Sequence, residues 1–561
     1  MKRDIRICGM IGFDWKRLLY LFLAVWAGVN LVQAIFTEVM SDEAYYFLYG
    51  ENLAWGYFDH PPMVGLMTFL SNLFWGGNLS VRFVTVVLQS FTLLLIWKTI
   101  ADKRPEIGRV VLFFVIAASL VMFQVYGFVT TPDAPFLFFT ALFLFSYKKF
   151  LRNESLLHTF LLAVAMAGMI YSKYHGVLII GFVLLSNLRL LSRYKFWLAG
   201  LLAVGLLLPH IYWQAANDFP SFKYHLSDRN SRFRWNYLLE YLPNQLAVFN
   251  PFTFGAVVYI LLKYKPRDVF ERGLYFLIAG VVLFFWAMSF RGHVEPHWTV
   301  ACSIPMLVLL YRRSLENPRL LRYVKKAIAP SLFLLLFARI LLLAGLLPEK
   351  LGFSGKRVKN EIICSVVGDV PVVFTGSFQG PSNYHFFTGK ESFVLSAIGG
   401  RQTQFDLWEK ELAHQGKQVF IYSGKNNSPF DGYFAENFQS VNRIRIDFTL
   451  TETEVRAGDT IRVPFRMQNP TAVAVDFHHP AFPVNCRAAY QVDERRGALT
   501  LADCVPDTPL GILPAKETAE GFFTAIVPDL APGNYLFSLS LVNSICAARN
   551  SDPAGLKIQK R

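Results

Sequence analysis

The chain has 561 residues, of which 53% are hydrophobic and only 17% are charged. This composition excludes an ordinary soluble domain and indicates a polytopic membrane protein. The formal net charge is +15, but the basic residues follow a topological pattern, described below, that does not call for a nucleic-acid partner.

Apolar runs long enough to cross the hydrocarbon core of a bilayer as helices, about 17–22 residues each, recur up to residue 347. They lie at residues 16–36, 81–99, 109–126, 134–150, 155–172, 175–191, 195–213, 247–264, 273–290, 297–312 and 326–347. We therefore expect about eleven transmembrane helices. The first run starts at Lys16 and Arg17 and has no small-residue cleavage site after it, so we expect a retained helix and not a cleaved signal peptide.

Lysine and arginine are distributed unequally between alternate connections. One set holds 25 of them and the other set holds 6. The basic set comprises 1–17, 98–109, 148–152, 189–195, 263–272 and 312–326. The other set comprises 37–80, 127–133, 172–175, 214–246 and 291–296. The positive-inside rule places the basic set in the cytoplasm, so an odd number of helices puts the C-terminal region outside.

The first external connection, residues 37–80, carries the most informative sequence. Ser41 is a suitable cap for a short helix whose first turn holds Asp42 and Glu43, where the helix dipole favours negative charge. An aromatic cluster follows, and residues 55–62 read Trp-Gly-Tyr-Phe-Asp-His-Pro-Pro. The two prolines open a second amphipathic stretch, and we expect both helical stretches to lie flat at the membrane interface.

Beyond residue 347 the pattern becomes that of an external region. Residues 348–440 mix short apolar strands with a helical segment, which favours a small α/β module. Residues 441–561 show short alternating runs separated by turn signals, which favours a β-sandwich. This region contains Cys364, Cys486, Cys504 and Cys546. Disulfides persist outside the cytoplasm, but the sequence does not choose among the possible pairings.

Several further polar groups belong to external connections. They are Asp133 in a Thr-Pro-Asp segment, Lys173 and His175, the arginines of 214–246 including Arg232, and Arg291 and His297. Each also has an ordinary explanation, such as a helix cap for Asp133, a snorkelling side chain for Lys173 or headgroup contact for the arginines. Their convergence on one side nevertheless favours a site built from loops above a helix bundle.

The pattern Asp-Glu-Ala-Tyr-Tyr…Trp-Gly-Tyr-Phe-Asp-His-Pro-Pro at 42–62 closely resembles the bacterial membrane glycosyltransferases related to protein O-mannosyltransferases and to the lipid A aminoarabinose transferase. Further matching segments follow in order. They are Val81-Arg82, Thr131-Pro-Asp133, Tyr171-Ser-Lys-Tyr-His-Gly176, Pro209–Asn217 and Val294–Trp298. The resemblance covers residues 1–310 and is weaker in the tail, where Gly400–Trp408 is the best segment. His297 departs from the asparagine expected before that tryptophan.

The resemblance implies the GT-C fold for the transmembrane domain at residues 1–347, and the extracytoplasmic β-sandwich at the end of the chain looks like an addition to the family core. It also implies a transferase that moves a sugar from a polyprenyl-phosphate donor to a hydroxyl of a glycan, lipid or protein acceptor. The enzyme would reside in the bacterial inner membrane, with its N-terminus in the cytoplasm and its C-terminal domain in the periplasm. The sugar, the acceptor and the oligomeric state stay open.

This chemistry assigns expected roles to the external residues. An acceptor hydroxyl needs a base or an orienting carboxylate, for which we select Asp42, Glu43 and Asp133. The leaving lipid phosphate needs cations, for which we select Arg82, Lys173, Arg291 and Arg232. The expected substrate pocket comprises Tyr45, Tyr46, Tyr57, Asp59, His60, His175 and His297. The histidines at 293 and 297 with Glu295 do not have the spacing of a zinc site, so we assign no metal, although a divalent cation stays possible.

Two other classes of protein compete with the enzyme. A transporter or lipid flippase is expected to carry charges or broken helices near the membrane midplane, whereas the spans here are nearly free of ionisable residues. A sensor or scaffold would not require paired acids in the first loop. Both alternatives are separated from the enzyme by an assay with a labelled polyprenyl-phosphate sugar.

Overall fold

The computed structural model describes residues 14–100, 106–225, 233–424, 428, 430–492 and 498–560. The chain divides into two compact units, one of residues 1–220 and 233–354 and the other of residues 221–232 and 355–561. Each unit contains its own cluster of buried hydrophobic side chains.

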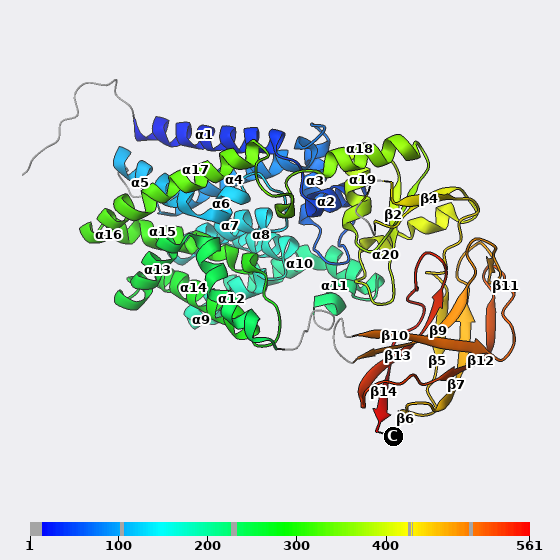
Figure 1. The fold of residues 1–561 in the computed structure, drawn as a ribbon. Helices are drawn as coiled ribbons and strands as arrows, with labels where there is room; N and C mark the ends of the chain where they lie inside the picture. The colour runs from blue at the N-terminus through cyan, green and yellow to red at the C-terminus, as the bar shows by residue number, and fades with distance from the viewer. Residues whose placement is uncertain are drawn as a thin grey trace, which may run out of the picture. The chain divides into compact units, whose positions relative to one another are not determined.

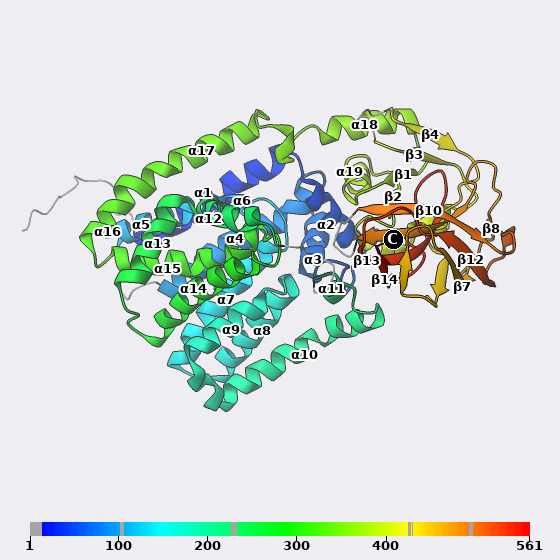
Figure 2. The same ribbon diagram turned by 60° about the horizontal axis from the view of Figure 1, so that its bottom comes forward.

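The first unit is built from helices (Figures 1 and 2). They are α1 (Trp15–Phe36), α2 (Ser41–Glu51), α3 (Met63–Asn72), α4 (Leu79–Ile100), α5 (Ile107–Ser119), α6 (Val121–Val125), α7 (Asp133–Arg152), α8 (Leu156–Ser172), α9 (Gly176–Ser186), α10 (Tyr194–Ala216), α12 (Trp235–Phe249), α13 (Pro251–Lys263), α14 (Val269–Met288), α15 (Ser303–Ser314), α16 (Pro318–Tyr323) and α17 (Ala329–Leu343). A 3-10 helix at Pro296–Cys302 precedes α15, and the short α11 (Pro220–Lys223) lies at the sequence boundary between the two units.

Six helical segments of the described chain are long and apolar enough to cross a membrane. They are α1, α4, α7, α10, α14 and the segment Pro318–Leu343 that includes α16 and α17. The bent pair α12–α13 adds a seventh if it forms one span, and four shorter apolar helices are α3, α5, α8 and α9. Each of the eleven predicted runs coincides with one of these helices or with neighbouring helical segments, so the polytopic helical architecture is confirmed. Fewer than eleven of the runs form a helix that is long and apolar enough to cross a membrane alone.

The predicted run 247–264 is interrupted for a visible local reason. Asn250 has φ +68°, and its side chain accepts a hydrogen bond from the backbone N–H of Phe252. Asparagine tolerates positive φ better than most residues, and Pro251 suits the first position of the helix that follows. As a result the chain turns by 103° between α12 and α13.

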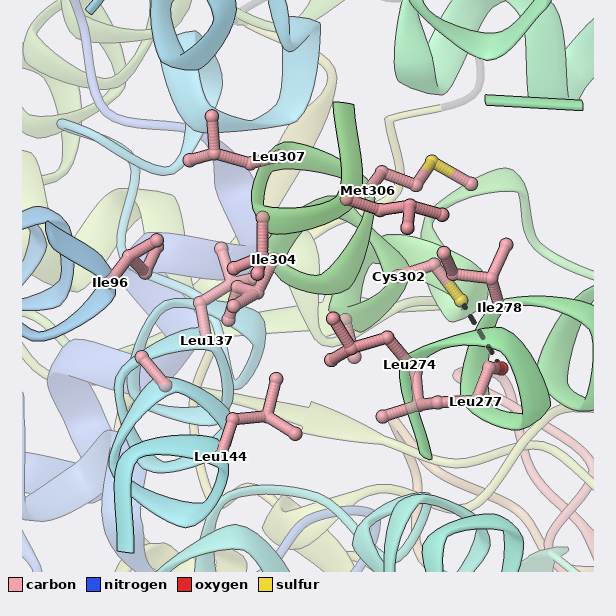
Figure 3. Close-up of a cluster of buried hydrophobic side chains, with 14 of the residues drawn as sticks. Ile96, Leu137, Leu144, Leu274, Leu277, Ile278, Cys302, Ile304, Met306 and Leu307 are labelled. Carbon is pink, nitrogen blue, oxygen red and sulfur yellow. Dashed lines mark hydrogen bonds between the residues drawn. The ribbon is translucent and has the colours of Figure 1, made fainter. Parts of the chain in front are cut away.

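The core of the first unit joins helices that are distant in sequence. Figure 3 shows Ile96 of α4, Leu137 and Leu144 of α7, Leu274 and Leu277 of α14, and Ile304 of α15. All of these side chains are almost entirely buried. Their packing gives a rigid base from which the connecting loops project.

The second unit begins with α18 (Lys356–Val367), and its first part combines a small sheet with helices. The strands are β1 (Val372–Thr375), β2 (Ser392–Leu395), β3 (Val419–Tyr422) and β4 (Gly432–Ala435), and the helices are α19 (Gln379–Thr388), α20 (Gln404–Trp408) and a 3-10 helix at Lys410–His414. The strand order is β2-β1-β3-β4, with β1 parallel to β2 and β3. The only antiparallel pair among these described strands is β3–β4.

The remaining strands form one eight-stranded sheet of order β5-β7-β12-β10-β9-β13-β14-β6, with a separate pair β8–β11. They are β5 (Arg445–Phe448), β6 (Glu454–Arg456), β7 (Thr460–Gln468), β8 (Val475–Asp476), β9 (Asn485–Val492), β10 (Leu499–Pro506), β11 (Ile512–Leu513), β12 (Thr518–Ile526), β13 (Gly533–Val542) and β14 (Ala554–Gln559). Strand β10 pairs with β9 in its first part and with β12 in its last part. The predicted sandwich thus takes the form of a single sheet whose two parts share one core. The described cysteines are free thiols, and a domain boundary at residue 441 stays a prediction.

The orientation in the membrane stays a prediction that a reporter can test. An alkaline phosphatase fused after residue 561 is expected to be active, because the basic connections place the C-terminus outside. The same reporter fused after residue 104, in a basic connection, is the matched control and is expected to be inactive. An inactive C-terminal fusion with an active fusion at 104 would reverse the predicted orientation.

Candidate active site

Helix α2 is held in place through Glu43, the second acidic residue of its first turn. The Glu43 side chain is completely buried and forms an ion pair with the equally buried Arg82 of α4. Its Oε2 accepts a hydrogen bond from the backbone N–H of Met40 at 3.0 Å, and its Oε1 accepts one from the backbone N–H of Thr130 at 2.9 Å. Met40, and not the predicted Ser41, therefore stands at the helix cap. Glu43 links the first loop to the loop that precedes α7.

Arg82 uses all five of its N–H groups inside the protein. Nε and Nη2 donate to the carboxylate of Glu43, and the remaining donors contact the backbone carbonyls of Ala34, Thr37 and Glu38. An arginine has five N–H donors and no acceptor. A phosphate contact at Arg82, as predicted from sequence, would therefore require this network to open. In the observed geometry Arg82 fixes the two ends of the connection between α1 and α2.

The loop at residues 127–133 is tied to the same network. The Thr130 hydroxyl contacts the hydroxyl of Thr85 at 2.6 Å and the carbonyl of Val81 at 2.8 Å. The backbone N–H of Thr130 binds Glu43. Asp133, three residues later, begins α7. The position of Asp133 relative to α2 is thus set by buried hydrogen bonds.

Asp133 is the centre of a second buried polar cluster. Its Oδ1 accepts a hydrogen bond from Lys173 Nζ at 2.6 Å, and its Oδ2 lies 3.3 Å from the hydroxyl of Tyr126 and 3.7 Å from Nε2 of His297. The Asp133 side chain is 3% exposed, the Lys173 side chain 10% and the His297 side chain 38%. The structure therefore brings together three residues that the sequence predicted from three different connections.

Tyr126 donates a hydrogen bond to Asp133 and so belongs to this cluster. It follows α6 and lies outside the candidate spans. Its pKa is raised by burial, by the charge of Asp133 and, more weakly, by the charge of Asp42. Asp42 itself is exposed on the first turn of α2. The negative charges of both carboxylates thus raise the pKa of one phenol, which no motif in the sequence indicated.

The aromatic part of the first loop forms its own hydrogen-bonded cluster. The Tyr49 hydroxyl donates to buried Asp59, and the Tyr46 hydroxyl lies 3.1 Å from Nε2 of His60. Tyr57 stacks on Tyr49 with ring centroids 3.8 Å apart and donates to the Tyr49 carbonyl at 2.8 Å. Burial, together with the charge of Asp59, raises the pKa of Tyr49, so its phenol remains a donor. Four of the predicted pocket residues are therefore neighbours.

Of the other predicted pocket residues, Tyr45 packs directly against this cluster. Its ring centroid lies 4.8 Å from that of Tyr49, and Tyr45 is almost completely buried. His175 lies elsewhere, after α8, with its ring 5.1 Å from the rings of both Trp298 and Phe285. His175 thus contacts the segment that also carries His297.

Two glycines explain part of the motif in the first loop. A Cβ on Gly56 would lie 2.3 Å from the ring of Trp213, and a Cβ on Gly65 would lie 2.5 Å from the hydroxyl of Tyr57. Neither position has room for a side chain. The Trp55 carbonyl also lies 2.6 Å from Nδ1 of His210 in α10. Since a carbonyl only accepts, Nδ1 carries the proton, and α10 anchors the loop.

Of the two remaining predicted cations, Arg291 is described by the structure. Arg291 is exposed in the turn after α14, on the segment that leads to His297. His293 and Glu295 of the same segment are 3.6 Å apart. Arg232 lies outside the described residues. Within the described part of the chain, no group of three or more His, Cys, Asp or Glu side chains converges as a metal site.

Part of the chain is similar to known proteins. Residues 59–213 match the family described as dolichyl-phosphate-mannose-protein mannosyltransferase. A curated relative, the lipid A galacturonosyltransferase RgtD of Rhizobium johnstonii, is 26% identical over 297 residues, which cover 49% of this chain and 60% of the relative. The chain thus spans less than two thirds of the length of that relative.

Solved structures extend the likeness to the fold. ArnT from Cupriavidus metallidurans in the apo state superposes with a TM-score of 0.56 at 12% identity, covering 73% of this chain and 94% of ArnT. The same enzyme bound to undecaprenyl phosphate gives 0.55 at 14% identity, covering 73% and 93%. These comparisons show an ArnT-like GT-C membrane fold and, over residues 59–213, a likeness to the dolichyl-phosphate-mannose-protein mannosyltransferase family.

Proposed function

We propose that this protein transfers a glycosyl group from a polyprenyl-phosphate donor to an acceptor hydroxyl on the extracytoplasmic side of the membrane. The observation that carries the proposal is the cluster of buried Asp133 and Lys173 with partly exposed His297, which Glu43 and Thr130 tie to the helix bearing Asp42. ArnT, which shares the fold, has been seen with undecaprenyl phosphate. This supports a polyprenyl phosphate as the lipid of the donor.

The proposed reaction exchanges one bond to the anomeric carbon. The acceptor oxygen attacks that carbon and loses its proton to the Asp42 carboxylate, while the bond from the anomeric carbon to the phosphate oxygen breaks. The electron pair leaves with the polyprenyl phosphate, which changes from a phosphodiester to a phosphomonoester with one more negative charge. Asp42 suits the base because it is exposed at a helix N-terminus, where the dipole favours its ionised form.

The Lys173 ammonium group is a suitable cation to stabilise the negative charge that develops on the leaving phosphate. Preorganised cations stabilise a transition state more than the ground state when charge develops beside them. The bond to Asp133 fixes the position of the ammonium group. His297 and Tyr126 contact the opposite oxygen of the same carboxylate, so Asp133 acts in this scheme by orienting its neighbours. Arg291, exposed on the segment of His297, is a second candidate for the phosphate.

The proposed chemistry requires an acceptor hydroxyl, and this hydroxyl can belong to a glycan, a lipid or a protein. The relative RgtD is described as a lipid A galacturonosyltransferase, which makes a glycolipid the first acceptor to test. Membranes containing the protein should transfer label from a radiolabelled undecaprenyl-phosphate sugar to extracted lipid A. Failure of transfer to every lipid, glycan and protein fraction tested, with several donor sugars, would contradict the proposal and favour the transporter.

Replacing Lys173 by methionine is expected to lower the transfer rate per folded protein by roughly 10–100-fold, because a hydrogen bond to a charged group contributes about 1.5–3 kcal/mol. Initial rates with labelled donor, divided by the amount of monodisperse protein, measure this. Lys98→Gln, at an exposed position of α4, is the matched control and should leave the rate unchanged. If activity falls only in proportion to the folded protein, Lys173 is an anchor and not a phosphate ligand.

A further inference from the structure

A buried arginine in the last membrane span has no part in the scheme above. Arg339 belongs to α17, and its residue exposure is 8%. Its Nη2 donates to Asn30 Oδ1 of α1 at 2.5 Å and to the backbone carbonyl of Gln124 at 2.7 Å. Ionisable residues within membrane spans are rare and usually functional, so this contact calls for an explanation.

The partners of Arg339 do not include an acid. Among the described residues no carboxylate forms an ion pair with Arg339, and its Nε is buried without a hydrogen-bond partner. Burying a charge without a counter-charge is costly, and an apolar side chain would join two membrane helices at lower cost. Simple attachment of α17 to α1 therefore does not account for an arginine at this position.

Arg339 also contacts the start of the loop that carries Asp133. Its guanidinium carbon lies 5.4 Å from the ring centroid of Phe128, and that of Arg82 lies 5.6 Å from the same centroid. Phe128 is thus contacted by two cations that are themselves fixed by other bonds. The preceding Gly127 packs so closely on Asn30 that a Cβ there would approach the Asn30 amide oxygen to 2.5 Å.

The contacts form a continuous chain from α17 to the candidate active site. Arg339 donates hydrogen bonds to Asn30 and to the Gln124 carbonyl, and Asn30 packs against Gly127. Three residues after Gly127, the backbone N–H of Thr130 donates to Glu43. Asp133 ends this segment and starts α7. Because a displacement of about 1 Å in a reacting group can reduce the rate by about 10²-fold, a support at the base of this loop has direct consequences for catalysis.

We propose that Arg339 is a positioning residue, which holds the 127–133 loop so that Asp133 keeps Lys173 in place for the transfer reaction. The proposal rests on the proposed function. It requires both features of the guanidinium: the bonds to Asn30 and Gln124, and the positive charge over the Phe128 ring, a cation–π contact.

The test compares Arg339→Met, which removes the charge and the donors, with Arg339→Lys, which keeps the charge. In the full-length protein, Arg339→Met is expected to lower kcat about 10–100-fold with an unchanged KM for the labelled donor, and Arg339→Lys should recover part of the loss. Arg319→Gln, exposed at the other end of the same span, is the control and should retain the wild-type kcat. Equal kcat for Arg339→Met and the wild type would overturn the proposal, as would a loss that only follows the amount of folded protein.

A second measurement keeps the proposal testable if Arg339→Met does not fold. Asn30→Leu removes one acceptor of Arg339 and should speed hydrogen–deuterium exchange in peptides covering 127–133, with unchanged exchange in the second unit. When both substitutions fold, the double variant should lose little more activity than Arg339→Met alone, because the two residues act through one contact. Unchanged exchange at 127–133 would overturn the positioning role. Absence of transfer in the wild type would instead contradict the proposed function, and the exchange result would still decide the role of Arg339.

Discussion

Replacing Asp42 by asparagine is expected to reduce glycosyl transfer by roughly 10²–10⁴-fold, the range that general-base catalysis contributes. Asparagine keeps the size of the side chain but cannot accept the proton of the acceptor hydroxyl. The helix should persist, since the loss of one favourable charge in its first turn costs about 0.3–1 kcal/mol. Single-turnover transfer from labelled donor, at equal amounts of folded protein, measures the effect.

The matched control for this substitution lies on the same helix. Glu51→Gln changes an exposed carboxylate at the other end of α2 and should leave the transfer rate within about twofold of the wild type, since it removes no group from the chemistry. The pH dependence of kcat/KM adds a second criterion, because the acidic limb should be absent in Asp42→Asn. Near-normal turnover of Asp42→Asn would remove Asp42 from the role of base and leave Asp133 as the remaining acidic candidate.

Local patterns in the sequence predicted the elements well, because they depend on neighbouring residues. Each apolar run corresponds to helix, and α2 begins within one residue of the predicted cap. The break at Asn250-Pro251 was also readable in principle, since that pair favours a turn before a new helix. Periodicity alone did not reveal it, because apolar residues continue on both sides of the break.

The pairing of side chains could not be predicted, because it depends on tertiary packing. Glu43 and Arg82 are separated by 39 residues, and Asp133 and Lys173 by 40. The sequence indicated that all four lie near one side of the membrane, yet it assigned Arg82 to phosphate when the fold uses its donors for Glu43 and three carbonyls. In the same way, the alternation of apolar and polar residues predicted strands in the second unit. It did not predict that β10 pairs with both β9 and β12 and so joins two parts of one sheet.

Replacing Glu43 by glutamine is expected to have the largest effect on stability, because it leaves the guanidinium of Arg82 buried without its counter-charge. Breaking a buried ion pair by removing one partner typically costs about 3–5 kcal/mol. The NH2 group of the glutamine amide would also face a backbone N–H donor, that of Met40 or that of Thr130, since these two groups donate to different oxygens of Glu43. We expect the thermal midpoint of the purified protein to fall by roughly 5–15 °C, as measured by fluorescence or light scattering in detergent.

The double variant Glu43→Met with Arg82→Met separates lost charge pairing from lost hydrogen bonds. Removing both charges should recover part of the stability, since no uncompensated charge remains. The recovery should be incomplete, because the backbone N–H groups of Met40 and Thr130 lose the carboxylate that accepts their hydrogen bonds. Glu51→Gln serves again as the exposed control and should change the free energy of unfolding by less than about 0.5 kcal/mol. A Glu43→Gln protein that melts like the wild type but transfers no sugar would contradict this prediction. It would show that the Glu43 carboxylate takes part in the transfer reaction and does not mainly stabilise the fold.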